Sequence, residues 1–239
     1  MIFANRKKAG TQLAEKIEQY LHQRFGVSKR PDVVVIGLPR GGVPVALEVS
    51  RKLHCPLEII AAKKLAYPGQ PEYAIGAVSS DGIVVLNPNV PTTAEWKSYV
   101  EDQRLRLLNA TQSIEEQFHE QSGTQRLSLQ NKLVIVVDDG IATGMTAMAA
   151  LESARHRGAT TTILAVPVIS PSSYYELRSH CNDILALSVP AQFMAVGQYY
   201  SSFAQTTNEE VVNALREGKT FPALARQSTV KTSATTNGQ

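Results

Sequence analysis

The stretch VIVVDDGIATGMTA, residues 134–147, joins an apolar run to two adjacent acids and then to small and hydroxyl residues. An uninterrupted apolar run is typical of a strand that is buried on both faces, as in a parallel sheet. Glycines after the acids let the backbone turn, and residues 145–157 predict a helix that Gly158 ends. The stretch therefore predicts a strand–turn–helix unit with Asp138 and Asp139 at the carboxyl end of its strand.

Apolar runs and helical patterns alternate along the rest of the chain. Further strands are predicted at residues 33–37, 57–65, 161–169 and 183–189, and further helices at residues 9–25, 43–53, 92–120, 171–180 and 208–217. The residues expected to pack the long 92–120 helix are Trp96, Val100, Leu107 and Ile114. Because strands that alternate with helices favour βαβ units, we expect an α/β, Rossmann-like fold with a mostly parallel central sheet and helices on both faces.

Residues 66–91 depart from this alternation. They are rich in turn residues and contain a hairpin signal around residues 80–82. We interpret them as an excursion from the core sheet that is partly mobile. Residues 1–222 are predicted to form a single domain with its core at about residues 31–190, and residues 223–239 to form a disordered polar tail.

The composition limits the class of protein. With 239 residues, 43% apolar and 19% charged, the chain is expected to be globular with a substantial core. A net charge of +3 fits an anionic small ligand and gives little support to nucleic-acid binding, since the longest basic run is residues 6–8. Cys55 and Cys181 form no C-x-x-C pair, so we interpret them as small buried apolar residues. Without a signal peptide or an apolar stretch of about 18 residues, a cytoplasmic protein away from the membrane is expected.

The segment that follows the strand at 133–137 has the chemistry of an anion site. Its glycines let the backbone approach a ligand, and Thr143 and Thr146 offer hydroxyl donors beside the positive end of a helix. The two aspartates can accept hydrogen bonds from vicinal sugar hydroxyls or hold a cation. A sugar phosphate is therefore the expected ligand. The alternative is an ordinary turn with an Asx-turn and a Thr cap.

Other phosphate-binding and catalytic motifs are absent from the sequence. The P-loop pattern, the dinucleotide fingerprint, the G-x-S-x-G elbow and the H-E-x-x-H zinc motif do not occur. A second glycine-rich loop, GLPRGG at residues 37–42, also joins a buried strand to a helix. Its amides and Arg40 suit phosphate oxygens, although a glycine-rich turn with a solvated arginine is the simpler alternative.

The sequence VIVVDDGIATGMT, residues 134–146, closely resembles the phosphoribosyl-diphosphate (PRPP) signature of type I phosphoribosyltransferases. GLPRGG lies where that family keeps its pyrophosphate loop, and the order of strands, loops and helices over about residues 31–190 is similar. The segment of Lys64, Leu65 and residues 68–72 resembles an uncharacterised bacterial branch of the family. The resemblance implies the type I phosphoribosyltransferase fold, with a lid or hairpin excursion at residues 65–82.

The resemblance also implies roles for individual residues. Asp138 and Asp139 would contact the ribose hydroxyls, and Mg²⁺ would be held mainly through PRPP near them. The 5-phosphate would bind at Gly140, Ile141, Ala142, Thr143, Gly144, Met145 and Thr146, and the diphosphate at Leu38, Pro39, Arg40, Gly41 and Gly42. Lys63 and Lys64 would neutralise the diphosphate, although two solvated lysines at a strand edge are an alternative. Family members commonly form homodimers.

The sequence says little about the acceptor. Many purine-specific members carry an acid where this chain has Ala142, which cannot transfer a proton. Glu72 in the lid, Phe203 and Gln205 are candidates for acceptor contacts, while aromatic packing is the alternative for Phe203. The expected activity is transfer of the phosphoribosyl group of PRPP to a nitrogenous base, with release of diphosphate. A non-catalytic PRPP or nucleotide sensor and a sugar-phosphate hydrolase are the competing hypotheses.

Overall fold

The computed structural model describes residues 1–26 and 32–221, without the side chains of residues 71 and 72. Its centre is a parallel sheet with the order β2-β1-β6-β7-β8. The strands of this sheet are β2 (Leu57–Ile59), β1 (Val33–Gly37), β6 (Leu133–Val137), β7 (Thr161–Val168) and β8 (Asp183–Ser188). Since all five run in the same direction, their carboxyl ends meet at one edge of the sheet.

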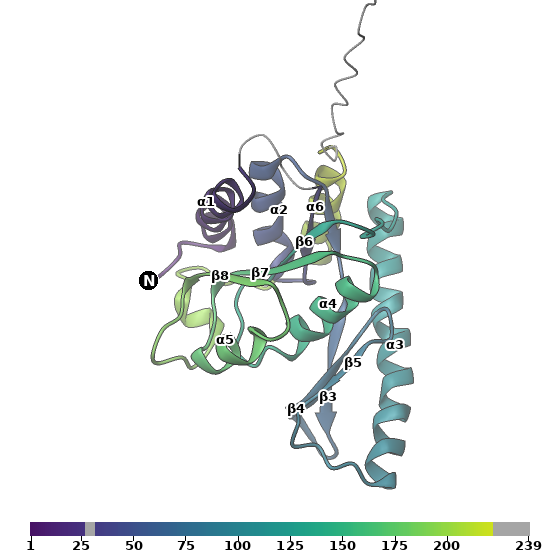
Figure 1. Cartoon of the computed structure of the whole chain (residues 1–239). Helices are drawn as coiled ribbons and strands as arrows, with labels where there is room; N and C mark the ends of the chain where they lie inside the picture. Colours follow the sequence, from purple (N-terminus) through teal and green to yellow (C-terminus); the bar gives the residue numbers. More distant parts are fainter. Residues whose placement is uncertain (27–31, 222–239) are drawn as a thin grey trace, which may run out of the picture.

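Helices cover both faces of this sheet (Figure 1). One face carries α1 (Arg6–Phe25), α2 (Gly42–Leu53) and α6 (Asn208–Gly218), and the other carries α4 (Met145–His156) and α5 (Pro171–Leu177). Successive side chains of β6 alternate between the two layers, because Ile135 packs with the first set of helices and Val134 and Val136 with the second. The predicted α/β fold, with a mostly parallel sheet between helices, is confirmed.

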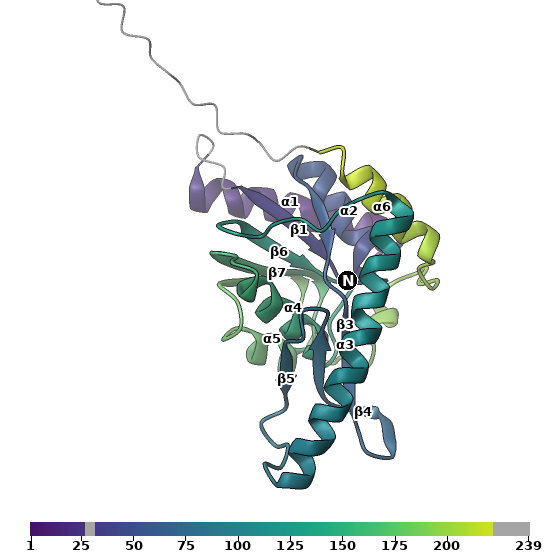
Figure 2. The ribbon, with the colours of Figure 1, turned by 90° about the vertical axis from the view of Figure 1, so that its right-hand side faces the viewer.

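A second, antiparallel sheet extends away from the central one (Figures 1 and 2). It consists of β3 (Ala62–Tyr67), β4 (Gln70–Ser79) and β5 (Val84–Leu86), and it packs against α3 (Ala94–Ser122). The hairpin predicted around residues 80–82 joins β4 to β5. All four residues predicted to pack α3 do so, namely Trp96, Val100, Leu107 and Ile114. The excursion is thus a folded sheet, and its predicted motion stays a prediction.

The single strand predicted at residues 57–65 was wrong in its extent. The chain forms β2 and then β3, which belong to different sheets. Between them, the amide of Ala61 donates to Glu115 Oε1 at 2.7 Å, and the carbonyl of Ala61 accepts from the Ser80 amide at 2.9 Å. The backbone therefore changes partners at Ala61, and this exchange depends on residues far along the chain.

Several smaller predictions can be checked against the structure. Cys55 and Cys181 are both buried in the core, and Gly158 has a φ of +89° just beyond α4, as predicted. No helix in the described part of the chain is long and apolar enough to cross a membrane. The single domain at residues 1–222 stays a prediction, and the tail predicted at residues 223–239 lies outside the described residues.

Candidate active site

The site lies where the direction of the sheet connections reverses. The loop after β1 leads to α2 on one face of the sheet, and the loop after β6 leads to α4 on the other. Because β1 and β6 are neighbours, this is the position at which sheets of this type typically have a ligand-binding crevice, beyond the carboxyl ends of the strands. The topology therefore brings together the two loops that the sequence singled out, at residues 37–42 and 138–146.

The two loops are in close contact, and glycine is what permits it. A Cβ added to Gly41 would lie 2.1 Å from Asp139 Oδ2, and one added to Gly42 would lie 2.6 Å from the Val137 carbonyl oxygen. The amide of Leu38 donates to that same carbonyl at 3.0 Å. The peptide bond between Pro39 and Arg40 is cis. The loop at residues 37–42 is thereby held directly against the carboxylate pair.

The two carboxylates occupy an environment that disfavours their charge. Burial raises the pKa of Asp138 well above its ordinary value, and the neighbouring Asp139 raises it further. Burial also raises the pKa of Asp139, while Arg6 opposes that shift. Asp138 Oδ1 accepts one hydrogen bond, from the Asp139 amide at 2.9 Å. A ligand that donates hydroxyl hydrogens to these oxygens would relieve part of the cost of desolvation.

The start of α4 presents a row of amides without acceptors. Among the described residues, no oxygen accepts a hydrogen bond from the amides of residues 142–147. Ala142 and Thr143 are exposed, and the Ala142 carbonyl accepts from the hydroxyls of Ser170 and Ser173 at 2.8 and 2.7 Å. The two serine hydroxyls therefore hold the loop from the α5 side, with Ala142 and Thr143 at the surface. Unpaired amides at the positive end of a helix suit a phosphate group.

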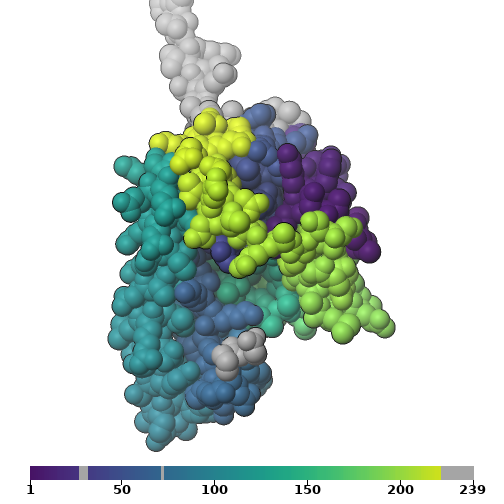
Figure 3. Space-filling model, turned by 180° about the vertical axis from the view of Figure 1, so that it is seen from behind, coloured from purple at the N-terminus to yellow at the C-terminus, as the bar shows by residue number. Residues whose placement is uncertain are grey.

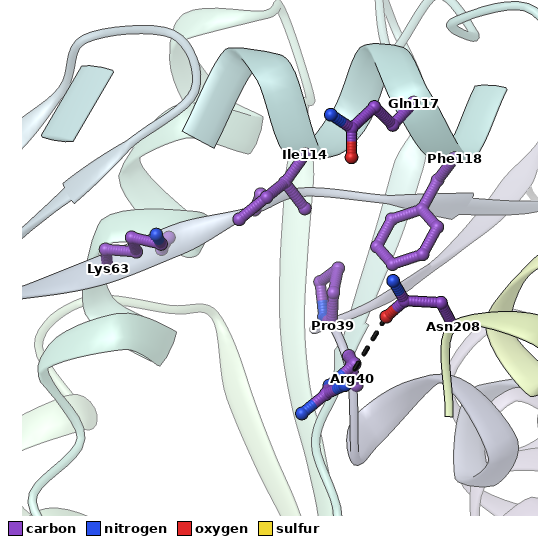
Figure 4. Close-up of a pocket in the computed structure, with 9 residues that line it drawn as sticks. Pro39, Arg40, Lys63, Ile114, Gln117, Phe118 and Asn208 are labelled. Atoms are coloured by element: carbon purple, nitrogen blue, oxygen red, sulfur yellow. Dashed lines mark hydrogen bonds between the residues drawn. The ribbon is translucent and has the colours of Figure 1, made fainter. Parts of the chain in front are cut away.

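A cavity of about 330 Å³ lies on the α3 side of the 37–42 loop (Figure 4). Arg40 and Lys63 enter it from the loop and from β3, and α3 contributes Gln117 and Phe118 to its wall. Arg40 Nη1 donates to Asn208 Oδ1 of α6 at 3.4 Å. The cavity thus joins two cations to a partly apolar wall, but neither Asp138 nor Asp139 lines it.

Lys63 and Lys64 are neighbours in the sequence, but their side chains lie on opposite sides of the antiparallel sheet. Both are exposed, and they follow one another in β3, so their side chains leave opposite faces of the strand. Lys63 lies opposite Val78, which packs on the α3 side, and Lys64 lies opposite Ala77, which packs on the α4 side. Only Lys63 shares the cavity with Arg40.

Residues 189–207, here called the capping segment, follow the last strand of the sheet. In Figure 3 this segment, in yellow-green, lies across a hollow from the antiparallel sheet and α3. Tyr199 and Tyr200 are buried and pack against Phe3 and Val168. Phe203 is 37% exposed and stacks on Tyr200 with ring centroids 4.9 Å apart. Gln205 is exposed, and the side chain of Glu72 lies outside the described residues.

Two residues of the site were not found from the sequence. Arg6 Nε donates to Asp139 Oδ2 at 2.7 Å, and the Tyr200 hydroxyl donates to the Asp139 carbonyl at 2.5 Å. In the sequence, Arg6 stands out only as part of a short basic run, and Tyr200 does not stand out. Neither belongs to a local motif, because their partner lies 133 positions away in one case and 61 in the other.

The donors in the crevice fit a magnesium ion that a substrate helps to hold. In the described part of the chain, no three His, Cys, Asp or Glu side chains gather as metal ligands. Two carboxylates, those of Asp138 and Asp139, directly follow the carboxyl end of β6 instead. Mg²⁺ in proteins is typically bound by one or two carboxylates together with substrate phosphates and water, so this donor set is compatible with it.

Comparisons with known proteins identify the family of the chain. The model of the phosphoribosyl transferase domain matches residues 5–201. A candidate phosphoribosyl transferase of Mycobacterium tuberculosis, matched in strains CDC 1551 and H37Rv, is 40% identical over 213 residues. The match covers 88% of this chain and 46% of that protein, so the chain spans about half the length of the curated relatives it matches.

A solved structure has a fold similar to that of this chain. The crystal structure of TT1426 from Thermus thermophilus has a TM-score of 0.75 and 37% sequence identity to this chain. The similarity covers 91% of this chain and 99% of that one. With its central sheet, its two strand-end loops and the match over residues 5–201, the chain belongs to the phosphoribosyl transferase domain family.

Proposed function

We propose that the protein transfers the 5-phosphoribosyl group of PRPP to a nitrogenous base or a similar acceptor and releases diphosphate. The observation that carries the proposal is the contact between the 37–42 loop and the carboxylate pair. This contact brings Asp138 and Asp139, the proposed acceptors for the ribose hydroxyls, close to residues 40 and 41, whose amides donate to none of the described residues. PRPP has the matching order of groups, with a phosphate, two ribose hydroxyls and a diphosphate.

Binding of the donor would use three parts of the crevice. The unpaired amides of residues 142–147 and the hydroxyls of Thr143 and Thr146 would hold the 5-phosphate. The ribose hydroxyls would donate to Asp138 and Asp139. The amides of residues 40 and 41, which donate to none of the described residues, would face the diphosphate together with Arg40 and Lys63.

Cleavage of the bond between the anomeric carbon and the diphosphate places growing negative charge on the leaving group. Arg40, Lys63 and the loop amides would stabilise that charge more in the transition state than in the ground state, which is how such donors accelerate a reaction. Asp138 and Asp139 would hold the sugar while positive charge develops on its ring. When bound, Mg²⁺ supplies further neutralisation of the phosphate oxygens.

The acceptor would approach from the face of the sugar opposite the diphosphate, on the side of the capping segment. Phe203 is partly exposed there, with Tyr200 stacked on its ring and Arg6 over it, so an acceptor would meet the edge of the ring. Ala142 is exposed at the start of the phosphate loop and carries no acid. Any proton that leaves the acceptor must therefore be taken by another group, such as Glu72 of the proposed lid.

Calorimetry of PRPP binding with Mg²⁺ tests the proposal. The double variant Asp138→Asn with Asp139→Asn removes both charged acceptors, and we expect a loss of affinity of at least about a hundredfold, since hydrogen bonds to charged groups contribute about 1.5–3 kcal/mol each. The matched control is Asp102→Asn, which removes an exposed carboxylate that pairs with Arg106 on α3. Undiminished affinity in the double variant would refute the assignment.

Diphosphate release from PRPP, assayed with a panel of bases, separates the enzyme from the sensor. Release that depends on both a base and Mg²⁺ supports the transferase. Tight PRPP binding without release for any base would support the non-catalytic sensor instead. Release of diphosphate without any acceptor, with water in its place, would support a hydrolase.

A further inference from the structure

Arg6 reaches the carboxylate pair from the first turn of α1. Besides donating to Asp139 Oδ2, it donates from Nη1 to the Ala204 carbonyl at 2.6 Å. Its Cζ lies 3.9 Å from the centroid of the Phe203 ring. The side chains of Arg6 and Asp139 are each only 13% exposed. One guanidinium therefore links the N-terminal helix, the carboxylate pair and the capping segment.

These contacts form a closed ring around Asp139. Arg6 lies over Phe203, Phe203 stacks on Tyr200, and the Tyr200 hydroxyl donates to the Asp139 carbonyl. On the remaining side, the Asp139 carboxylate lies against the backbone of Gly41. A Cβ added to that glycine would lie only 2.1 Å from Asp139 Oδ2. The orientation of the carboxylate is thus set jointly by α1, the capping segment and the 37–42 loop.

We propose that Arg6 is a positioning residue of the ribose site. It orients the Asp139 carboxylate for the sugar hydroxyls and fastens the capping segment beside them. The guanidinium fork is suited to this double task, since it can donate to a carboxylate and a carbonyl at once while stacking on an aromatic ring. This inference rests on the proposed function, because the hydroxyls belong to the ribose of PRPP.

Two measurements on Arg6→Gln, Arg6→Lys and the control Lys8→Gln test the inference. The first is the hydrogen exchange of the amides of the capping segment in the ligand-free protein. The second is the affinity for PRPP with Mg²⁺ at pH 7, by calorimetry. Lys8 is exposed on the same turn of α1, so its variant removes an equal charge without a contact to Asp139.

We expect Arg6→Gln to accelerate exchange in the capping segment and to lower PRPP affinity at least about tenfold, the usual scale for the loss of one hydrogen bond between charged groups. Arg6→Lys keeps a cation that can still donate to Asp139, so it should recover part of the affinity. Lys8→Gln should behave as the unmodified protein.

A fourth variant separates the contact of Arg6 with Asp139 from its packing on the capping segment. Phe203→Leu removes the ring beneath the guanidinium and leaves the ion pair intact, so exchange should accelerate while PRPP affinity falls less than in Arg6→Gln. Unchanged PRPP affinity in Arg6→Gln would overturn the inference. Tighter PRPP binding by that variant would also overturn it, because Arg6 would then compete with the sugar hydroxyls.

Failure of the proposed function gives a different result. If no variant binds PRPP and the unmodified protein does not either, the proposed function fails. The exchange measurement needs no ligand, and it decides by itself whether Arg6 fastens the capping segment.

Discussion

At the scale of single residues, the carboxylate pair occupies an environment that is unfavourable for its charge. Asp138 is followed directly by a second acid, and its pKa is raised by burial and by that neighbour. In the folded, ligand-free protein this group therefore binds protons more readily than in the unfolded chain. By linkage, such a group lowers stability as the pH rises above the pKa of the unfolded state.

Asp138→Asn should consequently stabilise the ligand-free protein at pH 7. The amide keeps the shape and carries no charge to desolvate, so we expect a gain of about 1 kcal/mol, or roughly 2–4 °C in Tm, for a chain of this size. The gain should vanish toward pH 3, where the carboxyl is neutral in both states. Thermal unfolding at several pH values measures it, and a lower Tm at pH 7 would contradict the argument.

The sequence around Asp138 and Asp139 identifies these two residues as site candidates, but it does not identify the residues that contact them. Asp138 and Asp139 stand out because a charged pair directly follows an apolar run, and this signal lies within a few residues. Arg6 pairs with Asp139 across 133 positions, so no spacing rule could identify it. In the same way, the sequence joined Lys63 and Lys64 as neighbours, whereas the alternation of a strand directs them to opposite faces.

At the scale of elements, α3 is attached to the central sheet through a buried polar cluster. The Glu58 carboxylate accepts from the amides of Ile59 and Leu127 at 2.7 and 2.6 Å, and His119 Nε2 lies 3.1 Å from Glu58 Oε1. One turn earlier, Glu115 accepts from the amide of Ala61. This attachment places Gln117 and Phe118 of α3 in the wall of the cavity beside the 37–42 loop.

Because of this cluster, the stability of the folded protein should depend on pH through the protonation of His119. Its pKa is raised chiefly by the neighbouring Glu58 carboxylate, so its contribution is complete below the unfolded pKa of about 6.5 and is lost as the pH rises through the folded value. His119→Gln removes the positive charge beside that carboxylate and should lose about 1 kcal/mol of stability at pH 6.

The difference between His119→Gln and the unmodified protein should shrink by pH 8.5. Urea unfolding at the two pH values gives the comparison, with His156→Gln, an exposed position in the last turn of α4, as the control. A loss that is the same at both pH values would show that shape rather than charge holds α3 to the sheet.

At the scale of the whole molecule, the first residues of the described chain and the capping segment stabilise one another. Phe3 is 2% exposed, and its amide and carbonyl pair with Tyr199 and Ser201 at 2.8 Å each. Its ring lies 5.5 Å from that of Tyr200. Residues from both ends of the fold therefore close the crevice on the side where the acceptor is proposed to bind.

Phe3→Ala should loosen this closure. Truncation of a buried phenylalanine typically costs about 3–5 kcal/mol, and here we expect much of the loss to appear as local opening of the capping segment. Hydrogen exchange of the Ser201 amide should accelerate, and PRPP affinity should fall. Ile2→Ala, at a position 69% exposed, is the control. Unchanged exchange at Ser201 would show that the segment is held by other contacts.

The sequence by itself determined the strands, the helices and the two glycine-rich loops, because hydrophobic period and turn chemistry act over a few residues. It also carried the resemblance to the family, since the signature is one continuous stretch. Only the tertiary structure decided that β2 and β3 belong to different sheets and that Lys63 and Lys64 separate. The tertiary structure likewise decided that Arg6 and Tyr200 contact Asp139. Those outcomes depend on which distant segments pack together, a choice set by the burial of whole helix and sheet faces.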